Sequence, residues 1–218
     1  MSIFSQHSRS VSKRGFTLIE LLVVISIMLI LTSIFLLRQQ RFNSTTLLRS
    51  LAYSVALSVR QAQVYGTSIR ESATGAFDAG TAAKAYGVYF SSANTGSYVL
   101  FADIDNDGQY DAPGENVKVF SLSTGYAIDK FCATTNSAVE KCWTSGSPTI
   151  TNLSFYFRRP NPDTCFTTSA GTNACAPAPS GETYTSGYVR LVSGADTRII
   201  KVTLTGQITV CSQNAASC

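Results

Sequence analysis

The sequence predicts an α+β fold in which one long N-terminal helix packs on an antiparallel β-sheet. Three observations point to this fold. An apolar run from Phe16 to Leu37 contains neither Pro nor Gly, and an amphipathic pattern continues from it to Tyr65. Beyond that point, short segments rich in aromatic and β-branched residues alternate with turn residues. A helix with one apolar face and a set of strands bury their apolar surfaces against each other.

Residues 1–15 are polar and basic, and residues 16–37 are long and apolar enough to cross a bilayer core of roughly 30 Å as a helix. Positive charge favours the cytoplasmic side, so we expect residues 1–15 in the cytoplasm and the rest exported. An ordinary secretory signal has a shorter apolar core and a small-x-small cleavage site, and neither is found here. The polar segment contains no acidic residue; its basic and titratable residues are His7, Arg9, Lys13 and Arg14.

Glu20 lies inside the apolar run, and packing alone does not explain it. An ionised side chain in hydrocarbon is strongly unfavourable unless it is paired or protonated. A plain signal anchor fits the length of the run but leaves this carboxylate without a partner. We therefore expect the partner of Glu20 to be the main clue to function.

The stretch KRGFTLIELLVVI, from Lys13 to Ile25, resembles the prepilin signal of type IV pilins and type II secretion pseudopilins. The resemblance covers only the start of the chain. It implies that a prepilin peptidase cleaves between Gly15 and Phe16, that the new amine of Phe16 is methylated, and that the apolar run is retained. It also implies that Glu20 pairs with the N-terminal amine of a neighbouring subunit. Because an unpaired buried charge is penalised, such a pair sets the register between subunits.

Composition argues against catalysis and against general nucleic-acid binding. Without residues 1–15 the chain has 14 basic and 13 acidic residues, so its net charge is close to zero. The single histidine, His7, lies in the leader, and the mature chain has no imidazole for a catalytic triad, a Cys-His pair or a histidine metal site. We therefore expect that this protein is not an enzyme.

Six cysteines lie in the exported part, and an even number outside the cytoplasm favours disulfides. Sequence alone leaves their connectivity open, although pairing in sequence order closes three short loops. Zinc is the rival interpretation, but no Cys-x-x-Cys pair is present. In sequence order the cysteines are Cys132 and Cys142, Cys165 and Cys175, and Cys211 and Cys218.

The helix is predicted to continue through residues 38–66, with Gly66 as its C-cap. Apolar residues at three- and four-residue spacing predict that a sheet covers one face of this half. These residues are Leu48, Leu51, Ala52, Val55, Val59 and Ala62.

Residues 67–218 are predicted to form a β-rich globular domain. Residues 71–85 are small and polar and predict a loop, and residues 160–187 predict an insert held by Cys165 and Cys175. Strands are predicted at 86–90, 98–101, 116–122, 153–157, 188–192, 200–204 and 208–210, the last two as a hairpin.

The string DIDNDGQYDAPGE, which begins at Asp103, is the second notable motif. Aspartates at alternate positions before a glycine can converge their oxygens on calcium. The match to an EF-hand loop is partial, because position twelve is Gly114 and the flanks resemble strands. The alternative is an acidic turn, since Asp, Asn and Gly are turn residues. Some pseudopilins with similar turns bind calcium, and the candidate ligands here are Asp103, Asp105, Asp107, Asp111 and Glu115.

The segment from Val202 to Cys211 resembles the C-terminal strand pair of H-type minor pseudopilins and related minor pilins. Some members hold DNA with two arginines after the glycine. Gln207 and Thr209 occupy those positions here, so the phosphate contacts are missing and DNA binding is not expected.

The resemblance implies a structural subunit of a type IV pilus or a type II secretion pseudopilus, assembled from the inner membrane after cleavage. Its expected partners are the membrane, the prepilin peptidase, the inner-membrane assembly platform and other subunits, and it would end in a periplasmic or extracellular filament. Two alternatives stay open: a minor pilin that binds DNA for uptake, and an anchored surface domain that never polymerises.

Overall fold

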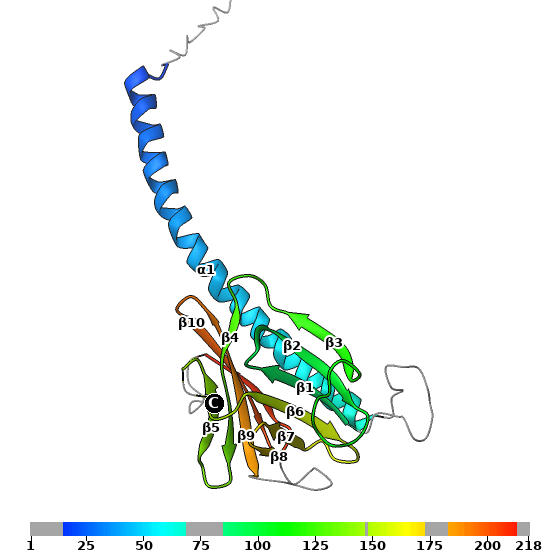
Figure 1. Cartoon of the computed structure of the whole chain (residues 1–218). Helices are drawn as coiled ribbons and strands as arrows, with labels where there is room; N and C mark the ends of the chain where they lie inside the picture. The colour runs from blue at the N-terminus through cyan, green and yellow to red at the C-terminus, as the bar shows by residue number, and fades with distance from the viewer. Residues whose placement is uncertain (1–14, 69–84, 147, 173–182, 213–218) are drawn as a thin grey trace, which may run out of the picture. The chain divides into compact units, whose positions relative to one another are not determined.

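The computed structural model of the chain describes residues 15–68, 85–146, 148–172 and 183–212, with the backbone only at 37–43. It divides into two compact units, residues 1–43 and residues 44–218. The described residues form one helix and eleven strands (Figure 1). The helix α1 (Leu18–Thr67) contributes residues to both units.

The predicted single long helix is confirmed, because α1 is continuous over 50 residues. Thr17 caps its start: the Thr17 hydroxyl accepts a hydrogen bond from the backbone N–H of Glu20 at 3.3 Å. Between Leu18 and Leu36, the large apolar side chains of the helix are exposed in the isolated chain. By length and composition, Leu18–Leu36 can cross a membrane, and its 19 residues measure roughly 28 Å as a helix.

The strands form two antiparallel sheets, where one sheet was predicted. The order in the first sheet is β3-β2-β1-β6-β7-β8, and in the second β11-β10-β9-β4-β5. The strands of the first sheet are β1 (Ala85–Ser91), β2 (Asn94–Asp103), β3 (Asn116–Ser121), β6 (Asn152–Arg158), β7 (Thr164–Thr168) and β8 (Gly171–Thr172). Those of the second are β4 (Ala127–Thr135), β5 (Glu140–Thr144), β9 (Tyr184–Ser193), β10 (Asp196–Thr203) and β11 (Ile208–Cys211).

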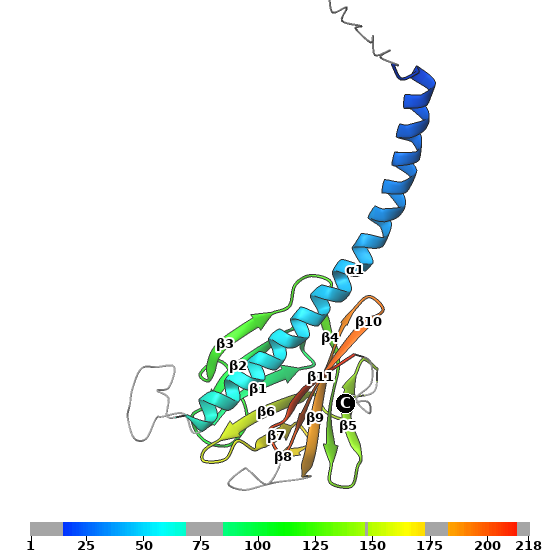
Figure 2. The ribbon, with the colours of Figure 1, turned by 180° about the vertical axis from the view of Figure 1, so that it is seen from behind.

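The core lies between the two sheets and the residues of α1 that belong to the domain (Figure 2). The predicted helical stripe is confirmed, since Leu51 is partly buried and its other five members are fully buried. Aromatic rings fill the centre. Phe155 of β6 lies 5.7 Å from Phe90 and 5.6 Å from Phe166, measured between ring centroids, in edge-to-face contacts that favour a unique packing.

Polar contacts hold the helix in place on the domain. The Gln63 amide donates to the carbonyl oxygens of Pro162 at 2.9 Å and Gly206 at 3.3 Å. At the other end of the packed segment, the Thr45 hydroxyl donates to the Asp196 carboxylate at 2.7 Å. These bonds determine which face of the helix remains outside.

The strand predictions need two corrections. The strands β4 and β5 were not predicted. The insert predicted at 160–187 is wrong over β7, which is fully buried and pairs with β6. The sequence of β7, TCFTT, looks polar, but threonine is β-branched and its methyl group packs well in a sheet. Residues 71–84 of the predicted loop lie outside the described residues.

Gly66 is not a C-cap. The helix runs past it to Thr67, and a Cβ atom at Gly66 would lie 2.2 Å from the carbonyl oxygen of Phe157. Glycine is needed here because the last turn of α1 touches the backbone of β6.

Disulfide formation was predicted with the connectivity left open, and the structure contains the Cys132–Cys142 pair of the sequence-order arrangement. This bond links directly opposed residues of β4 and β5. Cys165 and Cys211 are also disulfide-bonded. Cys175 and Cys218 lie outside the described residues, so the other two predicted pairs stay predictions.

Removing the Cys132–Cys142 disulfide is expected to lower the free energy of unfolding by about 2 kcal/mol, because the bond closes a short loop and ties down β5 at a sheet edge. The double variant Cys132→Ala/Cys142→Ala avoids a free thiol. Urea unfolding of the full-length chain in detergent, followed by circular dichroism, measures the change. Unchanged stability would mean that β5 contributes little to the cooperative unit.

Candidate functional site

The first turn of α1 carries the residues of the N-terminal motif. Phe16, two residues before the start of α1, is 81% exposed, and Glu20 in the first turn is also exposed. Thr17 and Glu20 stand at the cap and third positions, the spacing of a capping box. An acidic residue there is also favoured by the helix dipole. Within the described residues the Glu20 carboxylate accepts no hydrogen bond, so it remains available to a group from outside.

The acidic string forms the loop between β2 and β3, and two of its carboxylates are buried. Asp103 is 1% exposed and Glu115 is 6% exposed. Asp103 accepts backbone N–H bonds from Asn106 at 2.6 Å and Gly108 at 3.1 Å. The buried Asp103 carboxylate therefore holds the backbone of the loop in place.

Glu115 accepts backbone N–H bonds from Ile104 at 2.7 Å and Asp111 at 2.9 Å. All four inner carboxylate oxygens thus hold backbone donors. Gly108 has φ +77°, and its Cα packs so close to the Tyr156 ring that a Cβ would lie 2.6 Å from the Tyr156 hydroxyl.

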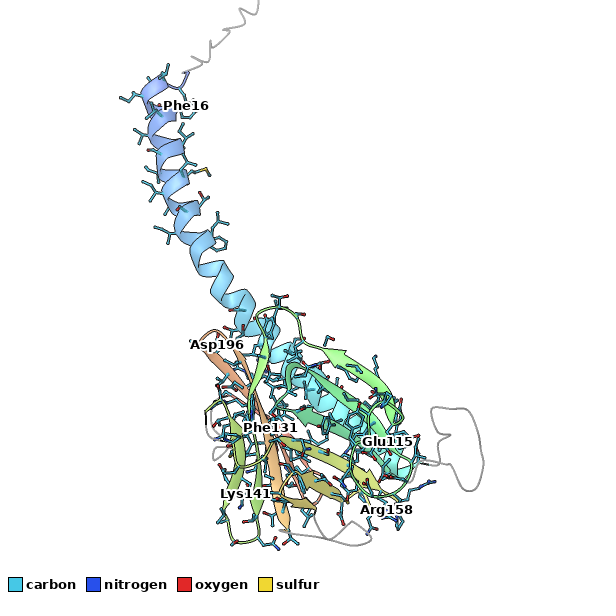
Figure 3. The ribbon with its side chains drawn as sticks, viewed as in Figure 1. Phe16, Glu115, Phe131, Lys141, Arg158 and Asp196 are labelled. Carbon is cyan, nitrogen blue, oxygen red and sulfur yellow. A yellow bond between two sulfur atoms is a disulfide. The ribbon has the colours of Figure 1, made fainter. Side chains whose placement is uncertain are left out.

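The outer carboxylates are arranged differently. Asp105 and Asp111 are exposed and Asp107 is half-buried. One oxygen from each of the three lies within 4.8 Å of the others, and Asp105 also groups in this way with the inner pair. The loop therefore presents a concentrated negative charge on its outer side. The label of Glu115 in Figure 3 marks where the loop lies in the domain.

A groove runs between the outer face of α1 and the free edge of β11. One part is lined by Arg49, Tyr53 and Arg198, and the adjoining part by Leu57, Arg60 and the β10–β11 turn. None of the described residues that line the two parts is acidic. The sequence did not single out this groove. The available signal was the four-residue spacing of Arg49, Tyr53 and Leu57 on the helix face opposite the buried stripe.

Comparison with known protein families supports the N-terminal motif. The model of the prokaryotic N-terminal methylation motif matches residues 11–36, which include Gly15, Phe16 and Glu20. This match supports the resemblance of the N-terminal segment to that of type IV pilin and pseudopilin precursors. Neither the curated proteins nor the solved structures gave a match.

The motif and the apolar helix together indicate membrane anchoring of this pilin-like chain. The family is structural and not enzymatic. The α+β architecture, a long helix followed by antiparallel sheets, is pilin-like as predicted. The match ends at residue 36 and does not extend to the β domain.

The five candidate calcium ligands lie in one loop, but they differ in burial. Two are buried and three lie on the outer side of the loop. The positions that hold arginine in DNA-binding relatives, Gln207 and Thr209, line the groove beside Arg60. Glu20 and Phe16 belong to the other unit of the chain.

Burial raises the pKa of Asp103 from 3.8 to about 6, against the lowering effect of its backbone donors, and burial also raises the pKa of Glu115. A carboxyl with a raised pKa stabilises the fold when protonated. Its contribution is present below about pH 4 and is lost as the pH rises through about 6.

We expect the difference in unfolding free energy between the wild type and Asp103→Asn to shrink from pH 4 to pH 7. Asparagine does not titrate, so the pH dependence of this position disappears in the variant. Urea unfolding at several pH values measures it, and Asp163→Asn, an exposed carboxylate elsewhere, is the control. A constant difference over this range would contradict a titration of Asp103.

Proposed function

We propose that this chain is a structural subunit of a type IV pilus or a type II secretion pseudopilus. It is inserted in the inner membrane with residues 1–15 in the cytoplasm, cleaved after Gly15 and methylated on Phe16. Extraction from the membrane then places it in a periplasmic or extracellular filament. Its partners are the prepilin peptidase, the inner-membrane assembly platform and other pilin or pseudopilin subunits.

The observation that carries the proposal is the motif at residues 11–36, on a helix whose apolar surface is exposed and whose single carboxylate is Glu20. An apolar helix is stable in lipid, and equally in a bundle of identical helices. In the bundle, Glu20 pairs with the Phe16 amine of a neighbour, and neither charge remains alone in an apolar surrounding.

Processing and assembly together test the proposal. Mass spectrometry of the chain from cells with the peptidase should find a mature chain that begins at N-methylated Phe16, and peptidase-deficient cells should keep Met1. Immunogold electron microscopy should then find the mature chain in filaments. An unprocessed chain in peptidase-positive cells would refute the proposal, and a processed chain that never enters filaments would favour an anchored surface domain.

We also propose that calcium binds at the outer side of the acidic loop. Asp105, Asp107 and Asp111 fit a cation because their oxygens converge. The inner carboxylates fit less well, because they are buried and all four of their oxygens accept backbone N–H bonds. Asp105 and Asp107 each accept a backbone N–H bond at one oxygen only. Three carboxylates fall short of the 6–8 oxygens that calcium takes, so water would complete the site and affinity would be weak.

Millimolar calcium is accordingly expected to raise the Tm of the full-length chain by a few degrees relative to chelator. Asp111→Asn should abolish the shift, because it removes one ligand charge and none of the loop's backbone bonds. Differential scanning calorimetry in detergent measures it, with magnesium as the control ion. Equal Tm values in calcium and in chelator would contradict calcium binding by this loop.

A further inference from the structure

The groove between α1 and β11 combines three cations with exposed apolar surface. Tyr53 is 46% exposed and Leu57 is 68% exposed, and they lie between Arg49 and Arg60 on the helix. The β11 side adds the free edge of a sheet, since β11 ends its sheet. Such a surface is suited to a partner that brings negative charge and covers apolar side chains.

The arginines of the groove are not neutralised by the described residues. Among the described residues, Arg198 donates to the carbonyl oxygens of Thr197 and Ser212, and Arg60 donates to the Gln63 side-chain oxygen. Arg49 lies over the Tyr53 ring at 5.8 Å. The ion pair among the described residues is elsewhere, between Arg190 and Asp129 at 2.6 Å.

The same domain carries the complementary charge on the acidic loop. Residues 44–218 contain 12 basic and 12 acidic residues, so the domain as a whole is neutral. Five of the acidic residues lie between Asp103 and Glu115. A neutral domain with separated charges attracts copies of itself, whereas it has no net attraction for a polyanion.

The Arg49 end of the groove is too far from the acidic loop to meet it within one copy. The acidic loop packs on Tyr156 through Gly108, next to Phe157, which Gly66 touches. Arg49 lies 17 residues before Gly66, about 25 Å along the helix. Figure 3 likewise shows Glu115 of the loop far from Asp196, which lies beside Thr45.

We propose that the groove of one copy, centred on Arg49, Tyr53 and Leu57, receives the acidic β2–β3 loop of a second copy. The inference rests on the proposed function and adds the surface through which the domains contact each other. Groove and loop are different patches, so the contact is heterologous, and such a contact repeats indefinitely unless it closes into a ring. That is the geometry a filament requires.

Charge reversal in the full-length chain tests the contact. Arg49→Glu, or Asp111→Arg, should each reduce filament yield at least about tenfold, because a like charge then faces a like charge. Combining them should restore yield to within about threefold, since the pair is re-formed with reversed sign. Lys118→Glu, an exposed cation outside the groove, is the matched control and should leave yield unchanged.

A photoreactive amino acid at position 57 provides an independent readout. Illumination should produce a covalent dimer whose adduct maps to the acidic loop, and Asp111→Arg should reduce it. The experiment is done in chelator, because calcium would mask the loop charge.

Failure of the inference is distinguishable from failure of the proposed function. Wild-type filaments with no rescue in the double variant, or with adducts outside residues 103–115, would overturn the groove contact and leave the filament role intact. Labelled DNA captured by the full-length chain in low salt, and released by Arg49→Glu, would overturn it in favour of a nucleic-acid groove. A loop adduct without filaments would support the contact and refute the filament role.

Discussion

Replacing Glu20 with alanine is expected to leave membrane insertion and cleavage intact and to lower filament yield at least about a hundredfold. Removing one partner of a buried ion pair leaves the other charge unpaired, which here is the Phe16 amine of the neighbour. The loss of a partner destabilises such an assembly by about 3–5 kcal/mol. Each 1.4 kcal/mol is a factor of ten. Filament yield from sheared cells, normalised to membrane-bound mature chain, measures the effect.

Glu20→Gln separates pairing from local helix capping. Thr17 and Glu20 have the spacing of a capping box, and glutamine is also favoured in the third position of that motif. A capping role therefore predicts that Glu20→Gln assembles normally and Glu20→Ala does not. A charge pair predicts that both fail.

Ser26→Ala is the matched control within the same helix. The Ser26 hydroxyl donates to the Val23 carbonyl oxygen of its own helix at 2.8 Å, so its loss should not affect neighbours. Intact filaments from Glu20→Ala would remove the role assigned to this carboxylate and favour an anchored domain that does not polymerise.

Gly66→Ala is expected to lower the free energy of unfolding of the domain by about 3 kcal/mol. Helix propensity alone predicts the opposite, since alanine is about 1 kcal/mol better than glycine within a helix. The added methyl, however, meets the carbonyl oxygen of Phe157 at 2.2 Å, and a backbone atom cannot rotate away. The last turn of α1 must move off β6, which is the cost of overpacking.

Urea unfolding of the full-length chain in detergent measures this change, with Ser50→Ala as the control on the exposed face of the same helix. The control should be neutral or slightly stabilising. A Gly66→Ala variant as stable as the wild type would mean that the end of α1 is not held against β6 in solution.

Local pattern was enough to predict much of this fold. The helix followed from an uninterrupted apolar and then amphipathic pattern, and its buried stripe was correctly identified at Leu48, Val55 and Val59. Aromatic and β-branched residues also identified β1, β2, β3, β6, β9, β10 and β11, whereas β4 and β5 were not predicted. The strand β7 was missed because its threonines look like loop residues until they are seen fully buried against β6.

The candidate sites divide in the same way. Glu20 and the acidic loop were visible in the sequence because a carboxylate in an apolar run, and several carboxylates around a glycine, are local signals. The α1–β11 groove was not visible, since Arg49 and Arg198 are 149 positions apart in the chain and meet only through the fold.

By itself the sequence determined the membrane-length helix, the processing motif and the presence of an acidic loop, because each depends on residues that are neighbours along the chain. Only the tertiary structure decided that Gly66 serves close packing and that Asp103 and Glu115 turn inward while Asp105 and Asp111 face outward. Burial and contact between distant segments depend on how the sheets and helix assemble, and no local pattern specifies that assembly.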